Sequence, residues 1–206
     1  STSGTSVVLA QGASADDLIV IVVYDVFSVA DTVSKTNGGT FDGTINFAQN
    51  PTVSSVPLTN TPAFEAYVSA TVENFTDNTA AKMPANTEVF DSDGKYDTSN
   101  YRFTPTVAGK YFIYAGAIPR SESNFDILVQ ELYIYKNGSE YRWATMRPTN
   151  SNNSNENHIT IQAIMDLDAD DYVEIYANCN TTSNAQWKFQ ERNKSNYFGA
   201  YKLIGV

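Results

Sequence analysis

Two neighbouring segments in the last third of the chain alternate between apolar and polar residues. In HITIQAIMDL, one face holds Ile159, Ile161, Ala163, Met165 and Leu167, and Ile164 alone interrupts the polar face. In DDYVEIYANC, one face holds Val173, Ile175, Ala177 and Cys179. Because side chains alternate between the two faces of a strand, this period indicates two strands that each bury one face. We find no amphipathic helical pattern longer than two turns, so the sequence predicts an all-β protein.

Further strand-like segments recur at intervals of roughly 10–15 residues from residue 62 onward, a spacing typical of β-sandwiches. AFEAYVSATV, GKYFIYAGAI and FDILVQELYIYKNG are the clearest examples. The last of them ends in Asn137-Gly138, a dipeptide that favours a two-residue hairpin turn. These strands are enough for one two-sheet jelly roll.

The chain divides into three parts by composition. Residues 1–48 combine short apolar strands with Gly38, Gly39 and Gly43, and we expect a β-rich stalk or attachment segment in which three copies share one core. Residues 49–61 contain Pro, Ser and Thr without any charge, which predicts a linker. Residues 62–206 form the predicted jelly-roll head.

The charge balance limits the partners. The net charge of −10 argues against binding nucleic acid or anionic lipid, because both use Lys and Arg. With Cys179 as its single cysteine, the chain forms no internal disulfide. No apolar run approaches the roughly 18 residues of a membrane helix, so we expect no membrane insertion.

The order of motifs in the head resembles the C1q/TNF-like jelly-roll family. The matching stretches are AFEA at residues 63–66, VFDSDGKYD at 89–97, RFTPTVAGKYFIYAGA at 102–117, YKNG at 135–138, LDADDYVEIY at 167–176 and YFGAYKLI at 197–204. One position departs from the family pattern, because Asp170 stands where the family has glycine. C1q-like domains usually form homotrimers, so the resemblance implies a trimer.

The N-terminal part is similar to connector modules of phage tail fibres. ADDLIVIVVYDVFSVADTV and GGTFDGTINF resemble segments of virion proteins from marine and cyanobacterial phages. Together, the two resemblances imply a non-enzymatic, homotrimeric tail fibre or similar virion appendage. Its N-terminal segment would join other virion proteins, and its head would contact a host surface glycan or protein or cap the trimer. A capsid decoration or head-fibre protein, or a soluble C1q-like ligand for carbohydrate or protein, are the alternatives.

Four tyrosines are candidates for the trimer interface. Tyr133, Tyr135, Tyr176 and Tyr201 fall on the less apolar faces of their predicted strands. Exposed aromatic stripes are unfavourable on a monomer, whereas a contact between copies would bury them. The sandwich core and isolated surface positions are the alternatives.

Two acidic turns have partial calcium-loop spacing. The first turn has Gly94 among three carboxylates, Asp91, Asp93 and Asp97. The second turn has carboxylates at positions one, three and five of a calcium loop, Asp166, Asp168 and Asp170. Position twelve of the two loops is Arg102 and Ala177, where a calcium loop has a bidentate Glu. We therefore interpret both as polar turns and expect no cofactor. A Ca²⁺ ion remains the alternative for either turn.

The longest polar segment, RPTNSNNSNENH at residues 147–158, is a candidate recognition loop. It holds Asn150, Asn152, Asn153, Asn155 and Asn157. A solvated connection is the alternative, although long loops often carry function. Hydrolysis by a serine or cysteine nucleophile commonly needs a His base. We expect His158 at the surface and Cys179 in the core, so we predict no enzyme activity.

Overall fold

The computed structural model describes residues 59–123, 125–148 and 156–204, the short strands Thr52–Val53 (β1) and Val56–Pro57 (β2), and residues 12, 14–16 and 18. The chain divides into two units, Ser1–Asn46 and Phe47–Val206. The predicted stalk lies almost entirely outside the described residues and stays a prediction. Within the predicted linker, β1 and β2 pair as a short antiparallel ladder.

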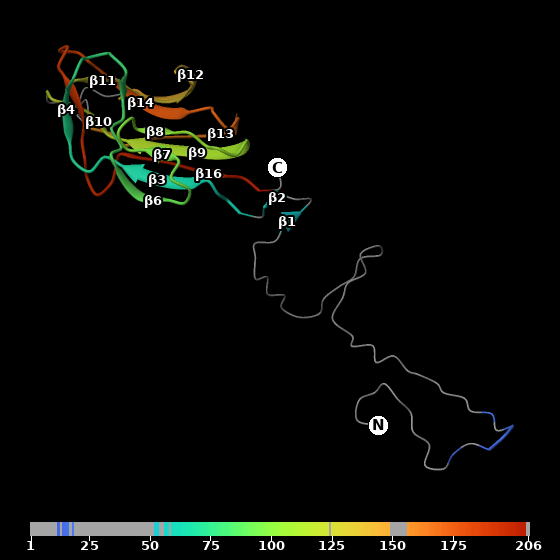
Figure 1. Cartoon of the computed structure of the whole chain (residues 1–206). Helices are drawn as coiled ribbons and strands as arrows, with labels where there is room; N and C mark the ends of the chain where they lie inside the picture. Colours follow the sequence, from blue (N-terminus) through green and yellow to red (C-terminus); the bar gives the residue numbers. More distant parts are fainter. Residues whose placement is uncertain are drawn as a thin grey trace. The chain divides into compact units, whose positions relative to one another are not determined.

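The second unit contains two main antiparallel sheets (Figure 1). The first has the order β13-β9-β16-β3-β6 and consists of Ala63–Tyr67 (β3), Thr87–Asp91 (β6), Gly109–Ala117 (β9), Ile159–Leu167 (β13) and Tyr197–Lys202 (β16). The second has the order β12-β11-β14-β8-β7, with β5 also paired to β14. It consists of Ala81–Lys82 (β5), Tyr96–Asp97 (β7), Arg102–Phe103 (β8), Ile127–Lys136 (β11), Ser139–Met146 (β12) and Val173–Thr181 (β14).

A third, smaller sheet has the order β10-β15-β4. It consists of Val72–Phe75 (β4), Pro119–Ser121 (β10) and Trp187–Phe189 (β15). The described residues contain no helix, and the all-β prediction is confirmed.

The strand pairing is that of a jelly roll. β3 pairs with β16, β8 with β14, β9 with β13, and β11 with β12, all antiparallel. Strands that are outermost in the chain thus pair with each other, as do the innermost ones, and rolling up this nested hairpin produces two packed sheets. Additional pairing of β16 with β9 and of β14 with β11 joins the pairs within each sheet. The jelly-roll prediction is confirmed.

The alternating segments bury the faces that the sequence indicates. In β13 and β14, all nine predicted inward side chains belong to the buried core: Ile159, Ile161, Ala163, Met165, Leu167, Val173, Ile175, Ala177 and Cys179. Ile164, the exception in the pattern, is 56% exposed on the opposite face of β13. The predicted strand faces are therefore confirmed, exception included.

Four aromatic rings from separate motifs meet in the core. Phe64 of the AFEA motif is stacked on Tyr96 and Phe103, with ring centroids 4.5 and 4.7 Å apart, and meets Phe198 edge-on at 4.9 Å. The buried Tyr96 hydroxyl donates to the carbonyl of Ala85 at 2.7 Å, which satisfies its only polar group. These motifs, which lie far apart along the chain, thus contribute to one packed cluster.

Asn137 and Gly138 form the predicted hairpin turn. Lys136 of β11 pairs with Ser139 of β12, which leaves two residues between the strands. Both have positive φ, 51° at Asn137 and 75° at Gly138, as a type I′ turn requires.

The sandwich has two distinct ends. The amide of Lys202 donates to the carbonyl oxygens of Asn60 and Pro62 at 3.3 and 3.1 Å, so residues 60–62 and the end of β16 lie together. We call this end the base. The small sheet lies at the other end, which we call the tip, as the positions of β4 and β10 in Figure 1 show.

Candidate functional site

The carboxylates of the first acidic segment hold the backbone of two successive turns, one between β6 and β7 and one between β7 and β8. Asp91 accepts the amide of Tyr96 at 2.8 Å, while Asp97 accepts the amides of Ser99 and Asn100 at 2.8 and 3.1 Å. Together with a hydrogen bond from the Asn100 side chain, which has the largest effect, these bonds lower the pKa of Asp97. The oxygens of these turns therefore already have donors.

The turn between β13 and β14 is held by Asp171, which the calcium-like spacing did not single out. Its carboxylate pairs with Lys136 at 2.7 Å and accepts bonds from the Asn137 side chain at 2.6 Å and the Asp168 amide at 2.8 Å. These contacts, with the Lys136 hydrogen bond first, lower the pKa of Asp171 to about 2. The turn is thereby tied to the β11–β12 hairpin.

The weak metal candidates do not form a ligand cluster within the described part of the chain. Among those residues, no group of three or more His, Cys, Asp or Glu side chains is arranged to hold a metal ion. The candidates from the first turn are Asp91, Asp93 and Asp97, and those from the second are Asp166, Asp168 and Asp170. Asp166 instead pairs with Lys110 at 3.0 Å.

The candidate recognition loop reaches the sandwich at its tip. Asn150, Asn152, Asn153 and Asn155 lie outside the described residues, so their predicted role stays a prediction. Asn157 is described, and its side-chain amide donates to the Oε1 of Gln130 at 2.7 Å. Gln130 is fully buried and donates in turn to the carbonyl of Pro119. The end of the loop is thus fixed to β11 and to the small sheet.

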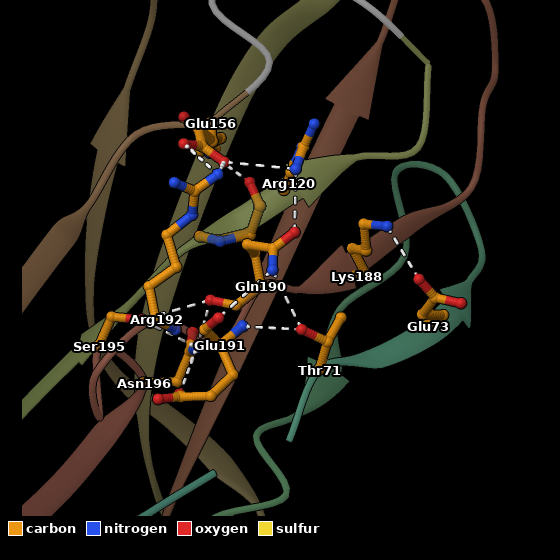
Figure 2. A network of polar contacts seen from close by, with 12 residues as sticks. Thr71, Glu73, Arg120, Glu156, Lys188, Gln190, Glu191, Arg192, Ser195 and Asn196 are labelled. Carbon is orange, nitrogen blue, oxygen red and sulfur yellow. Dashed lines mark hydrogen bonds and ion pairs between the residues drawn. The ribbon is translucent and has the colours of Figure 1, made fainter. Parts of the chain in front are cut away.

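A polar network lies beside this loop (Figure 2). Glu156 pairs with Arg120 at 3.6 Å and with Arg192 at 3.1 Å, and Arg120 also donates to Gln190 at 2.9 Å. Gln190 then donates to the hydroxyl of Thr71 at 3.1 Å. The residues of this network come from separate segments of the chain, which is why no sequence motif indicated the network. The network holds the loops of the tip against one another.

Asn196, which also belongs to the tip, is fully buried. Its Oδ1 accepts the amide of Ile118 at 2.8 Å, and its Nδ2 donates to the carbonyl of Gln190 at 2.8 Å. Because both the acceptor oxygen and the donor nitrogen of this buried side-chain amide are hydrogen-bonded, Asn196 fixes the segment before β16 without an unpaired buried polar group.

The outward face of the second sheet carries three of the four candidate interface tyrosines. Tyr133, Tyr135 and Tyr176 alternate with core residues along β11 and β14, so they point away from the core. The ring centroids of Tyr135 and Tyr176 are 4.4 Å apart. Trp143 of β12 pairs directly with Tyr133 and is 51% exposed. We call this surface the Trp143 face and define it as Glu131, Tyr133, Tyr135, Glu140, Trp143, Glu174, Tyr176 and Asn178.

Glu174 is a covered carboxylate within the Trp143 face, with a side chain only 2% exposed. Its Oε1 pairs with Lys82 at 2.8 Å and with Arg102 at 2.7 Å. The Arg102 guanidinium also lies 3.7 Å from the centre of the Tyr172 ring. Because Lys82 belongs to β5 and Arg102 to β8, these ion pairs fasten two short strands to β14.

Tyr201, the fourth candidate, lies on the other side of the sandwich. It alternates with core residues of β16 in the first sheet, and its ring centroid is 5.5 Å from that of Phe112. We call the outward face of this sheet the Tyr201 face and define it as Glu65, Tyr67, Phe90, Phe112, Tyr114, Ile164, Tyr197 and Tyr201. The four predicted interface residues therefore do not form one patch, and their place at a trimer interface stays a prediction.

Two glycines let aromatic rings lie against the backbone of the Tyr201 face. A Cβ added to Gly199 would lie 2.2 Å from Cζ of Tyr114, and one added to Gly116 would lie 2.6 Å from the Tyr197 ring. The Tyr114 hydroxyl donates to Glu65 at 2.9 Å. This arrangement keeps the rings close to the sheet and gives the only carboxylate in the defined set a donor.

His158 and Cys179, the two residues considered for catalysis, each contact other parts of the fold. Nε2 of His158 lies 3.1 Å from the carbonyl oxygen of Ser195, and the imidazole lies 6.0 Å from the Tyr197 ring. Cys179 is fully buried, and burial raises the pKa of its thiol to about 12. The thiolate is the nucleophilic form of cysteine, so a protonated core thiol is unreactive.

In the described part of the chain, no helix has the length and apolar character needed to cross a membrane.

The chain matches no protein-family model. Over 133 residues it is 36% identical to the phage-like element PBSX protein XkdV of Bacillus subtilis (strain 168). The chain is related to a phage-element protein. The matched stretch is 60% of this chain and 19% of XkdV, so the chain spans about a fifth of that relative's length.

Solved structures that are similar to the chain include a complement domain and a TNF protein. The globular domain of zebrafish complement 1qA protein covers 69% of this chain with a TM-score of 0.47 at 14% identity, and 98% of that domain is matched. Eiger TNF from S. frugiperda covers 70% with a TM-score of 0.48 at 11% identity, and 92% of it is matched. These scores are low, and the jelly-roll assignment rests on the strand pairing.

Proposed function

We propose that the protein is a non-enzymatic structural protein of a phage particle. It assembles as a homotrimeric tail fibre or similar appendage, and its head contacts the host cell surface or caps the trimer. The 36% identity to a phage-like element protein is the observation that carries this proposal. The N-terminal segment then joins the chain to other virion proteins.

The Tyr201 face is the surface that copies of the chain bury against one another. It is rich in aromatic rings, and Ile164 and Phe90 on it are 56% and 48% exposed. Burying such a surface is favourable by about 25 cal/mol for each Å² of apolar area. The resemblance to C1q-like domains implies three copies. Of the four predicted interface residues, Tyr201 then belongs to the contact, whereas Tyr133, Tyr135 and Tyr176 remain outside it.

The two ends of the sandwich give the head a direction. Residues 60–62, at the end of the predicted linker, lie at the base, while residues 156–158 of the candidate recognition loop and the polar network of Figure 2 lie at the tip. A head attached through its base presents the tip outward. This placement supports contact with a cell surface by the tip loops and the adjoining outward surfaces.

Sedimentation equilibrium of the full chain tests the assembly. At micromolar concentration we expect three times the chain mass of 22.6 kDa. Ile164→Asp should weaken the association at least tenfold, because it places an unpaired carboxylate in the contact. The matched control is Leu128→Asp, since Leu128 is 44% exposed and lies outside the Tyr201 face. A folded wild-type particle of one chain would contradict the proposal.

Two measurements on phage test the role. Gold-labelled antibody against the chain should mark the tail of the phage that encodes it, and labelling of the capsid would replace the tail fibre with a head fibre. An excess of the free full chain should slow adsorption of that phage to its host. Unchanged adsorption would mean that the head caps the trimer and does not contact the cell. Absence of label from the particle would overturn the proposal.

A further inference from the structure

The Trp143 face carries a row of rings across three adjacent strands. Trp143 of β12 pairs with Tyr133 of β11, which pairs with Tyr176 of β14. Adjacent strands are about 4.8 Å apart, so the row extends over roughly 10 Å. This length is close to that of a disaccharide. Trp143, at the sheet edge, is half exposed and stacks on no other ring of the described residues.

The polar groups between these rings are carboxylates that lack a cation of their own. Two cations next to this face, Lys82 and Arg102, both pair with Glu174. Glu131 accepts hydrogen bonds from neutral donors, a tyrosine hydroxyl at 2.5 Å and an asparagine amide at 3.0 Å. Glu140 is exposed, and its side chain forms no ion pair with another described residue. The residues that define the face therefore offer aromatic rings and hydrogen-bond acceptors, and their net charge is negative.

We propose that the Trp143 face binds an uncharged saccharide chain of the host cell surface. The faces of aromatic rings carry partial negative charge and attract the C–H groups on one side of a sugar ring. Carboxylates accept hydrogen bonds from sugar hydroxyls. The same carboxylates repel polymers that carry phosphate or carboxylate groups. This inference rests on the proposed function, because it supplies the ligand class for a head that contacts the cell.

A second copy of the chain fits the Trp143 face less well than a saccharide does. Contact between copies would remove Glu131 and Glu140 from water without giving either a cation, which is costly. The Tyr201 face has one such carboxylate in its defined set, Glu65, which accepts a bond from Tyr114, whereas the Trp143 face has two. In a trimer the Trp143 face is presented three times, so weak saccharide contacts add through effective concentration.

A glycan array probed with the full chain tests the proposal, using uncharged oligosaccharides beside sulfated and uronic-acid ones. We expect binding to uncharged members and at least tenfold weaker binding by Trp143→Ala. Trp143→Tyr, which keeps a ring, should restore most of the binding. Tyr141→Ala is the matched control, because Tyr141 lies on the same strand, is 46% exposed and is not part of the face. Thermal unfolding of each variant checks that it folds.

The outcomes separate this inference from the proposed function. No binding to uncharged glycans, equal binding to anionic ones, or full binding by Trp143→Ala would each overturn the inference. Dissociation of the Trp143→Ala trimer would also overturn it, because the face would then be a contact between copies. If the free chain still slows phage adsorption while the array is negative, the proposed function stands and the saccharide assignment fails.

Discussion

The two outward faces of the sandwich are both rich in aromatic rings, and they differ in what lies between those rings. On the Tyr201 face, rings lie against Gly199 and Gly116, and Glu65 is held by a tyrosine hydroxyl. On the Trp143 face, the rings alternate with two carboxylates that have no cation among the described residues, Glu131 and Glu140, whereas the defined Tyr201 face has one, Glu65. Burying unpaired charge is costly, so a count of aromatic residues does not tell which face associates. The polar residues between the rings decide that.

The largest effect should come from filling the space that lets a ring lie on the Tyr201 face. Gly199→Ala places a Cβ 2.2 Å from Tyr114, so the ring must move and its bond to Glu65 is lost. We expect the free energy of unfolding to fall by about 3 kcal/mol, as in overpacked cores. Urea denaturation of the full chain measures it.

The control for Gly199→Ala removes the ring instead of moving it. In a Tyr114→Ala background the added methyl group meets open space, so the further cost of Gly199→Ala should be less than about 1 kcal/mol. An equal cost in both backgrounds would show that the ring does not need this glycine. The account of the Tyr201 face would then be wrong.

The next largest effect should be on the Trp143 face, at its covered ion pairs. Glu174→Gln leaves Lys82 and Arg102 without a counter-charge, although their side chains are 28% and 36% exposed and keep part of their hydration. Because of that exposure we expect a loss of about 2 kcal/mol, below the range for fully buried pairs. Glu140→Gln, an exposed control on the same face, should change stability by less than about 0.5 kcal/mol. Equal effects of the two variants would mean that burial of Glu174 is unimportant.

A matched pair of substitutions compares the faces directly. Tyr114→Phe and Tyr133→Phe each remove a hydroxyl that donates to a carboxylate, Glu65 at 2.9 Å and Glu131 at 2.5 Å. Burial of each ring and the adjacent carboxylate raise the pKa of both tyrosines, with burial the larger cause. We expect about 1.5 kcal/mol for Tyr114→Phe and about 1 kcal/mol for Tyr133→Phe.

We expect the smaller loss for Tyr133→Phe because Glu131 has a second hydrogen-bond donor. Glu131 keeps a hydrogen bond from Asn178 at 3.0 Å, whereas Glu65 would lose its tyrosine donor on the face that we propose is buried between copies. Thermal unfolding of the full chain measures both values. A larger loss for Tyr133→Phe would indicate that the Trp143 face, and not the Tyr201 face, is the one buried in the assembly.

Strand alternation predicted which side chains enter the core but not which surface the others reach. The period of two assigned Tyr133, Tyr176 and Tyr201 to outward positions, because the residues beside them, except Lys202, are apolar. It contains no information on which sheet a strand joins, since pairing depends on partners far away in the sequence. The structure therefore separates Tyr201 from the other two, although all of them have the same local pattern.

The local sequence pattern also did not predict which charged side chains are covered or paired by residues of other strands. Alternation assigned Glu174 to an outward face, and it is outward, but Lys82 and Arg102 from distant strands cover it. The calcium-like spacing directed attention to Asp166, Asp168 and Asp170, whereas Asp171 holds the turn through Lys136. In both cases the partner lies on another strand, and only the sheet order brings the two charges together.

The smallest effect should be the acid sensitivity of the Trp143-face sheet, through Asp171. Its pKa is lowered to about 2, so it stabilises the fold while it is ionised, which is complete above the unfolded value near pH 4. That contribution, roughly 0.5 kcal/mol for an ion pair near the surface, should disappear as the pH falls from about 4 to 2. Asp171→Asn should lower stability at pH 7 and show a smaller decrease over this range. Unfolding measured by circular dichroism in steps of pH compares the two curves, and parallel curves would show that the bond from Lys136 to Asp171 does not help to hold β11 and β14 together.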